Sequence, residues 1–115
     1  MKKLISVLLM LFAAYNAQSA KIVTDSIKST ILKTTQKYNI YLPNGFENSN
    51  KKYPVVYLLH GLSDDYNAWR ERGRMDWALD ELIGTGEAVP MIVLMPNAGG
   101  RDTHNTWNGY FNMPG

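Results

Sequence analysis

The 115-residue sequence contains no cysteine. Disulfides, thiol chemistry and lipid attachment through an N-terminal cysteine are therefore excluded. Internal repeats and low-complexity tracts are also absent from the sequence. Its composition is that of an ordinary globular protein, and its length is sufficient for one domain, or part of one, but not for two.

The sequence also lacks an apolar run of the roughly 20 residues that are needed to span a bilayer. The apolar stretch Leu4–Ala14 is shorter, follows Lys2 and Lys3, and precedes the small-residue segment 17–19. This pattern is typical of a secretory signal peptide. We expect residues 1–19 to be cleaved after Ser19, leaving a secreted or periplasmic chain that is not stably inserted in a membrane.

An excess of basic charge is missing as well. Without Lys2 and Lys3, ten basic residues stand against ten acidic ones. A chain of this charge has little electrostatic attraction for polyphosphate, which argues against nucleic acid as a partner. Neutral substrates such as esters or sugars fit this balance better.

Two kinds of hydropathy pattern follow the predicted signal peptide. Residues 21–42 are rich in β-branched side chains, and Tyr38, Ile40 and Leu42 alternate with Lys37, Asn39 and Tyr41. This alternation predicts two half-buried strands, and the segment 43–45, Pro-Asn-Gly, predicts a turn. Residues 55–59 and 91–95 are instead continuous apolar runs, which predict two buried strands.

An amphipathic helix is predicted between these apolar runs. Met75, Leu79, Leu82 and Ile83 recur at helical spacing, and Gly84 and Gly86 are expected beyond the helix end as a glycine stop. A strand, a helix and a second strand of this length predict a parallel βαβ unit. The first strand ends in His-Gly, and the second is followed by the aperiodic segment 97–115, so we expect functional loops after both strands.

These elements together resemble the Putative esterase family of α/β-hydrolases, which includes feruloyl and acetyl-xylan esterases, S-formylglutathione hydrolase and the mycolyltransferases. The resemblance covers roughly residues 35–96. It depends on these features in this order: Tyr57-Leu58-Leu59-His60-Gly61, Trp69, Gly73-Arg74, Pro90-Met91-Ile92-Val93 and Pro96-Asn97. It implies an α/β fold, namely the N-terminal portion of an α/β-hydrolase in which antiparallel strands lead into a parallel βαβ unit.

The resemblance implies acyl transfer through a Ser-His-Asp triad, without a metal or organic cofactor. It assigns the backbone N–H of Leu62 to the oxyanion hole, and we expect His60 and Gly61 to orient that loop. An alternative role of His60 as the catalytic base fits poorly, because this residue precedes any expected serine. The other histidine, His104, is expected to be a surface residue or a substrate contact.

The motif Gly-x-Ser-x-Gly, which carries the nucleophile of this fold, is absent from the sequence. None of the four serines that follow the predicted leader lies in such surroundings: Ser26, Ser29, Ser49 and Ser63. We therefore expect residues 20–115 to be the N-terminal part of an esterase domain, with the triad beyond Gly115. The chain alone is expected to be inactive.

Aromatic and polar residues near the two loops are candidate substrate contacts. They are Trp69, Asn97, Arg101 and Trp107, of which Trp69 also suits a packing role and Trp107 is the best placed for substrate. Trp77 falls within the predicted helix and is expected in the core. The Asp64, Asp65 and Asn67 cluster does not have the spacing of an EF-hand, so we expect a solvated loop there and no metal.

The sequence therefore predicts an exported serine esterase that acts on feruloyl or acetyl esters of plant polysaccharide, or on small acyl esters. An acyltransferase of the mycolyltransferase type is one alternative. A non-catalytic binding module is another, although the apolar strand 55–59 would then leave an exposed sheet edge.

Overall fold

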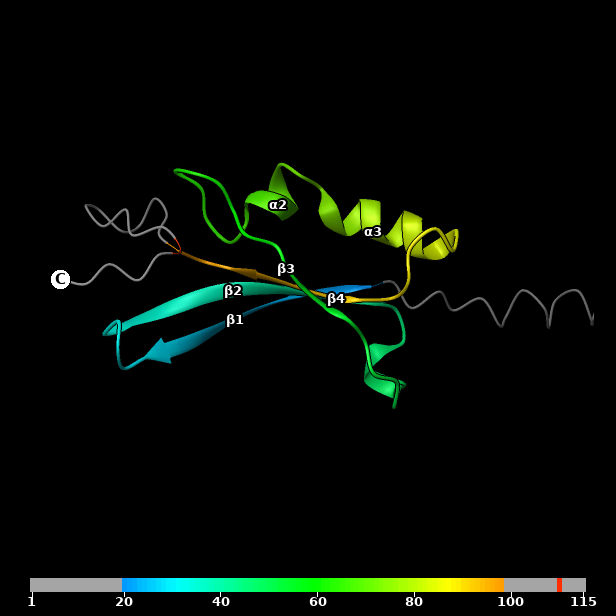
Figure 1. The fold of residues 1–115 in the computed structure, drawn as a ribbon, viewed down its shortest axis with the longest axis horizontal. Helices are drawn as coiled ribbons and strands as arrows, with labels where there is room; N and C mark the ends of the chain where they lie inside the picture. The colour runs from blue at the N-terminus through cyan, green and yellow to red at the C-terminus, as the bar shows by residue number, and fades with distance from the viewer. Residues whose placement is uncertain (1–19, 99–109, 111–115) are drawn as a thin grey trace, which may run out of the picture.

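The computed structural model describes residues 20–98 and Tyr110. In this part of the chain, the elements form a mixed sheet with the two α-helices on one side (Figure 1). In chain order they are β1 (Lys21–Ser29), β2 (Thr34–Leu42), the 3-10 helix η1 (Phe46–Asn48), β3 (Val55–Tyr57), α2 (Ala68–Glu71), α3 (Met75–Gly84) and β4 (Ile92–Pro96).

The sheet has the strand order β1-β2-β4-β3. Strands β1 and β2 pair as an antiparallel hairpin, β2 pairs antiparallel with β4, and β4 pairs parallel with β3. The two predicted N-terminal strands and the parallel βαβ unit are thus confirmed. The predicted turn is also present, since Phe46 N–H donates to the Pro43 carbonyl at 3.1 Å and Gly45 has a φ of 77°.

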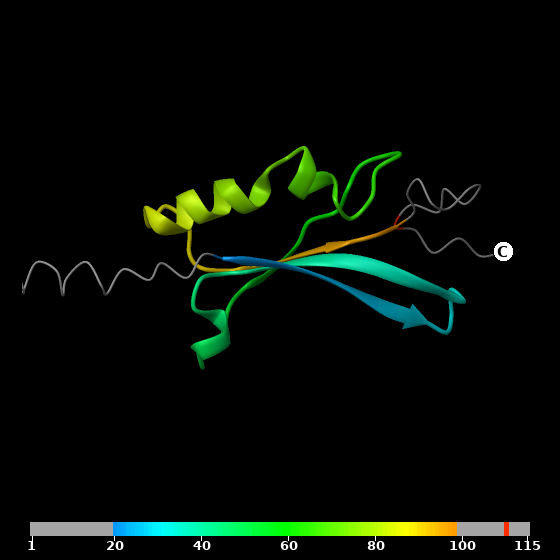
Figure 2. The same cartoon turned by 180° about the vertical axis from the view of Figure 1, so that it is seen from behind.

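The core lies between the sheet and the helices α2 and α3, which cover the same face of the sheet in both views (Figures 1 and 2). Its buried side chains come from three elements: Tyr41, Val93, Met95 and Met75. Leu79 and Ile83 pack against this cluster from α3, one and two helical turns after Met75. Along β2, the fully buried positions are Asn39 and Tyr41.

Helix α3 confirms the predicted amphipathic helix, and Gly86 follows it with a φ of 79°. Two details of the prediction were wrong: Gly84 is the last residue of the helix, and Leu82 is 39% exposed because it lies beside the stripe that packs on the core. The prediction that Trp77 is in the core was wrong: its side chain is 63% exposed. The helix turns this residue away from the stripe formed by Met75, Leu79 and Ile83, and the Arg74 guanidinium lies 5.2 Å from the centre of its ring. Within residues 20–98, no helix is both long and apolar enough to cross a bilayer.

The apolar run 55–59 differs from its prediction as a buried strand. Its paired part is Val55–Tyr57, and all three side chains are exposed, by 50%, 41% and 66%. The reason is the strand order, which gives β3 one neighbour and places β4 in the interior of the sheet. The other apolar run became the buried strand, with Val93 and Met95 almost fully enclosed.

Candidate active site

The loop that follows β3 contains three of the candidate site residues, His60, Gly61 and Leu62. We call residues 58–67 the His-Gly loop. Strands β3 and β4 run parallel, so their carboxyl ends meet at one edge of the sheet, which is where open α/β sheets place their ligands. The loop begins there, where Leu58 N–H donates to the Leu94 carbonyl at 2.9 Å, and it ends at α2 (Figure 1).

A tight turn presents Leu62. Asp64 N–H donates to the Gly61 carbonyl at 3.2 Å, and Ser63 has a φ of 62°. A positive φ at the third turn residue is the mark of a type II turn, and it is strained for a non-glycine residue. Within the described part of the chain, the Leu62 N–H donates no hydrogen bond, and its side chain is 71% exposed. The amide at the second turn position is thus available for a ligand oxygen.

His60 fastens this turn to the end of β4. Its Nδ1 lies 2.9 Å from the Gly61 carbonyl oxygen, and its Nε2 lies 3.0 Å from the backbone N of Ala98. Since a carbonyl only accepts and an N–H only donates, these contacts fit the neutral imidazole with its proton on Nδ1. Both ring nitrogens are bonded to backbone groups. The orienting role of His60 and Gly61 stays a prediction.

Tyr110 contacts the same histidine. Its hydroxyl oxygen accepts a hydrogen bond from His60 N–H at 2.9 Å, and the two ring centres are 5.3 Å apart. Burial raises the pKa of Tyr110, and the hydrogen bond from His60 opposes part of that effect. The contact links residues 50 positions apart, so sequence spacing gave no signal for it.

Trp69 supports the loop from the α2 side. Its indole Nε1 donates to the Leu59 carbonyl at 2.8 Å, while the residue remains 39% exposed. Gly73 passes so close to Trp69 that a Cβ at this position would lie 2.7 Å from the Trp69 carbonyl oxygen and 2.9 Å from its ring atom Cε3. Trp69 thus contacts the backbone of the loop, and its assignment as a substrate contact stays a prediction.

A buried amide holds the far end of the loop. Asn39, on β2, is completely inaccessible to solvent. Its Nδ2 donates to the Tyr66 carbonyl at 3.1 Å and to Asn67 Oδ1 at 2.9 Å. Sequence reasoning did not select Asn39, because the alternation along β2 put it with Lys37 and Tyr41, opposite the more apolar residues Tyr38, Ile40 and Leu42. In the structure it is Asn39 and Tyr41 that are fully buried.

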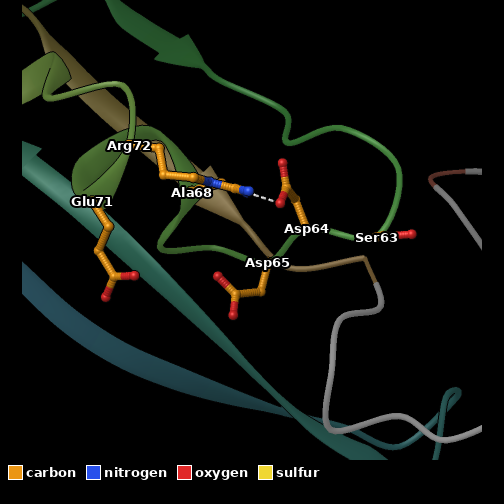
Figure 3. A pocket seen from close by; sticks show the side chains of 6 residues that line it. All are labelled: Ser63, Asp64, Asp65, Ala68, Glu71 and Arg72. Carbon is orange, nitrogen blue, oxygen red and sulfur yellow. Dashed lines mark ion pairs between the residues drawn. The ribbon is translucent and has the colours of Figure 1, made fainter.

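A shallow pocket of about 100 Å³ lies beside the turn (Figure 3). The lining is mostly polar and comprises Ser63, Asp64, Asp65, Ala68, Glu71 and Arg72. The Arg72 guanidinium reaches across to pair with Asp64, and Ser63 points away from that pair. The carboxylates of this lining could accept hydrogen bonds from the hydroxyl groups of a ligand. Among the residues that the structure describes, no group of three His, Cys, Asp or Glu side chains is placed to hold a metal ion.

The candidate substrate contacts are only partly covered by the structure. Asn97 directly precedes Ala98, its Nδ2 lies 3.5 Å from Gln36 Oε1, and its buried Oδ1 has no hydrogen-bond partner among the described residues. It therefore sits next to His60 at the carboxyl edge of the sheet. Arg101, His104 and Trp107 lie outside the described residues, as do residues 1–19 of the predicted signal peptide.

Comparisons with known proteins match this chain to an esterase family and to proteins named as feruloyl esterases. The family model described as "Putative esterase" matches residues 29–114. An endo-1,4-beta-xylanase/feruloyl esterase of Xylanibacter ruminicola is 36% identical over 64 residues, which cover 52% of this chain and 9% of that protein.

Solved structures give the same result. A ferulic acid esterase is 46% identical with a TM-score of 0.77, over 84% of this chain and 37% of its own. A serine-to-alanine mutant of the feruloyl esterase module from Clostridium thermocellum, complexed with sinapinate, is 33% identical with a TM-score of 0.65, over 72% of this chain and 29% of its own. The chain thus spans less than half of the length of each protein compared here.

Proposed function

The chain belongs to the Putative esterase family, and we propose that it supplies the oxyanion-binding loop of an exported carboxylic-ester hydrolase with a serine nucleophile. The proposed substrates are feruloyl or acetyl esters of plant polysaccharide, or small acyl esters. Support for this substrate class comes from a relative named as a xylanase/feruloyl esterase and from a similar structure named as a ferulic acid esterase.

The observation that carries the proposal is the Leu62 amide at the turn after β3. Its N–H lies outside the turn's own hydrogen bond, which joins Asp64 to Gly61. A backbone N–H is a fixed dipole that stabilises negative charge without reorganisation, and one such donor contributes about 2.7–4 kcal/mol to lowering the barrier. His60 holds this donor in place through Gly61 and Ala98.

The proposed reaction is acyl transfer to water. The serine hydroxyl attacks the ester carbonyl, its proton passes to the triad histidine, and the carbonyl oxygen becomes an anion that accepts the Leu62 N–H. The anion collapses as the carbon–oxygen bond to the alcohol breaks and the histidine returns the proton to the leaving group. Water then repeats the sequence on the acyl-enzyme and releases the acid.

The roles of the other site residues are proposed from their positions in the sequence and the structure. His60 and Gly61 orient the loop, and Trp69, Asn97, Arg101 and Trp107 are candidate contacts for the acyl or sugar group. Residues 1–19 are proposed as a cleaved signal peptide on their sequence pattern. The motif Gly-x-Ser-x-Gly is absent from the sequence, so the proposed nucleophile lies outside these 115 residues. The proposed mechanism requires neither a metal nor an organic cofactor.

The test is a chimera in which residues 29–114 replace the aligned segment of the ferulic acid esterase that is 46% identical. Hydrolysis of methyl ferulate is measured for the chimera and for two variants. Leu62→Pro removes the N–H, while proline suits the second position of a type II turn, so the loop shape is retained. Leu62→Ala keeps the N–H and removes most of the side chain.

We expect Leu62→Pro to lower kcat by roughly 10²–10³-fold and Leu62→Ala to leave kcat close to that of the parent chimera. Equal effects of the two variants, or an inactive parent chimera, would contradict the proposal. Acyl transfer to a sugar in preference to water would indicate the acyltransferase alternative. The 115-residue chain alone is expected to hydrolyse p-nitrophenyl acetate no faster than buffer.

A further inference from the structure

Asn39 is the one polar side chain that is buried among the described residues, with 0% of its surface exposed. It lies on β2, on the face that packs beneath the helices, two positions before Tyr41. Burying an amide in this way is costly unless its hydrogen bonds are made. Asn39 must therefore have hydrogen-bond partners that offset the cost of burying its amide.

The partners lie on both sides of the amide. Asn39 Oδ1 accepts a hydrogen bond from Thr24 Oγ1 at 2.6 Å, across the β1–β2 hairpin. The two Nδ2 protons go to the Tyr66 carbonyl oxygen and to Asn67 Oδ1. Because one side offers a donor and the other offers two acceptors, the amide has a single satisfactory orientation.

Both acceptors, on Tyr66 and Asn67, belong to the His-Gly loop. Hydrogen bonds within the loop connect these residues to the turn that contains Leu62. Asn67 N–H donates to Asp65 Oδ1 at 2.8 Å, and Asp64 N–H closes the turn onto Gly61. Asn39 thus fixes the end of a short, hydrogen-bonded segment whose start is fixed by His60. The Leu62 N–H lies between these two anchors.

We propose that Asn39 is a positioning residue for ester hydrolysis, acting through Tyr66 and Asn67 to place the Leu62 N–H. This inference rests on the proposed function of that amide. Misplacing an oxyanion donor weakens binding of the transition state more than binding of the ester, so kcat should change and KM should not.

Tyr41 provides a matched control on the same strand face. It is 1% exposed, and its hydroxyl donates to Asp80 Oδ1 at 2.7 Å, so it links β2 to α3 and not to the loop. Tyr41→Phe removes one part-buried hydrogen bond that does not involve the His-Gly loop. A kcat effect that comes only from loss of stability should appear in this variant too.

The first measurement is hydrogen exchange in the 115-residue chain and requires no catalysis. Asn39→Ala should speed the exchange of the Asp64, Asn67 and Ala68 amides on the order of tenfold, because their loop loses its buried anchor. Tyr41→Phe should leave these amides unchanged. Equal exchange in the two variants would overturn the positioning role, whatever the activity of the protein.

The second measurement is kinetics on methyl ferulate in the chimera described above. We expect Asn39→Ala and Asn39→Asp to lower kcat by roughly 10–100-fold at similar KM, whereas Tyr41→Phe keeps the parent kcat. Asn39→Asp conserves shape and the acceptor for Thr24 but loses both donors to the loop, so it excludes a cavity as the cause. Should Asn39→Ala fail to fold, Asn67→Ala removes one of the two loop contacts without creating a buried cavity.

The outcomes separate the two proposals. An Asn39→Asp or Asn67→Ala chimera that keeps the parent kcat overturns the positioning role while the proposed function stands. If the parent chimera is inactive, the proposed function is overturned, and so is a catalytic role for Asn39. Faster exchange of the loop amides in Asn39→Ala would then still show that Asn39 holds the His-Gly loop.

Discussion

His60 Nε2 accepts a hydrogen bond from the backbone N–H of Ala98 at 3.0 Å, across 38 positions of sequence. This bond joins the loop after β3 to the residue that follows β4 by two positions. The two carboxyl ends of the parallel pair are thereby held as one unit. The turn that presents Leu62 is therefore supported by tertiary structure and not by local sequence alone.

His60→Ala is expected to destabilise the chain by about 1–3 kcal/mol, because the half-buried Ala98 N–H would lose its acceptor. His60→Gln should recover part of this loss, since its side-chain oxygen can take the place of Nε2. Urea unfolding of both variants measures the difference. Equal losses in the two variants would show that the hydrogen bond is not what His60 contributes.

Two glycines at the ends of α3 should respond to alanine in opposite ways. Gly73→Ala places a Cβ 2.7 Å from the Trp69 carbonyl oxygen, a backbone atom, so we expect a loss of about 1–3 kcal/mol and altered Trp69 fluorescence. At Gly84, the last residue of the helix, an added Cβ meets nothing within 4 Å, so Gly84→Ala should stabilise the chain by up to about 1 kcal/mol. Thermal unfolding compares them, and a neutral Gly73→Ala would contradict the close approach.

Stability should fall at high pH through Tyr41. Burial, followed by the hydrogen bond and charge of Asp80, raises the pKa of this phenol above its ordinary value of 10.0. The folded state therefore favours the neutral form. The contribution of the neutral Tyr41 to the free energy of unfolding is complete below the ordinary pKa of the phenol. It is lost progressively as the pH rises above that value toward the raised pKa of the folded state.

Absorbance of phenolate during an alkaline titration, together with urea unfolding at each pH, tests this expectation. Tyr41→Phe should be less stable than the parent near neutral pH and should lose less stability above pH 10. Parallel stability curves for the two proteins would contradict the assigned cause.

The exposed face of β3 should make the 115-residue chain poorly soluble. Val55, Val56 and Tyr57 form an apolar edge strand, which is a template for pairing with other chains. Val56→Lys should reduce aggregation, as measured by light scattering, with little loss of folded structure. Val93→Lys is the contrasting variant, since it places a charge at a 2% exposed position and should unfold the chain.

Local sequence patterns predicted the main elements and the position of the candidate site. The alternation through Tyr38 and Leu42, the apolar run 91–95 and the glycine after α3 each predict a structure through the spacing of side chains along the chain itself. The His-Gly pair at the end of a strand likewise located the loop that presents Leu62. The esterase family and the α/β class followed from the same features and were confirmed.

Only tertiary structure decided which of these elements would be buried and which residues would support the loop. Pairing of β4 between β2 and β3 exposed Val55–Tyr57, and the rotation of α3 exposed Trp77. Asn39 meets Tyr66 and Asn67 across 27 and 28 positions. Periodicity records the preference of a segment for one face of its own helix or strand, whereas strand order and long-range hydrogen bonds depend on how separate segments pack together.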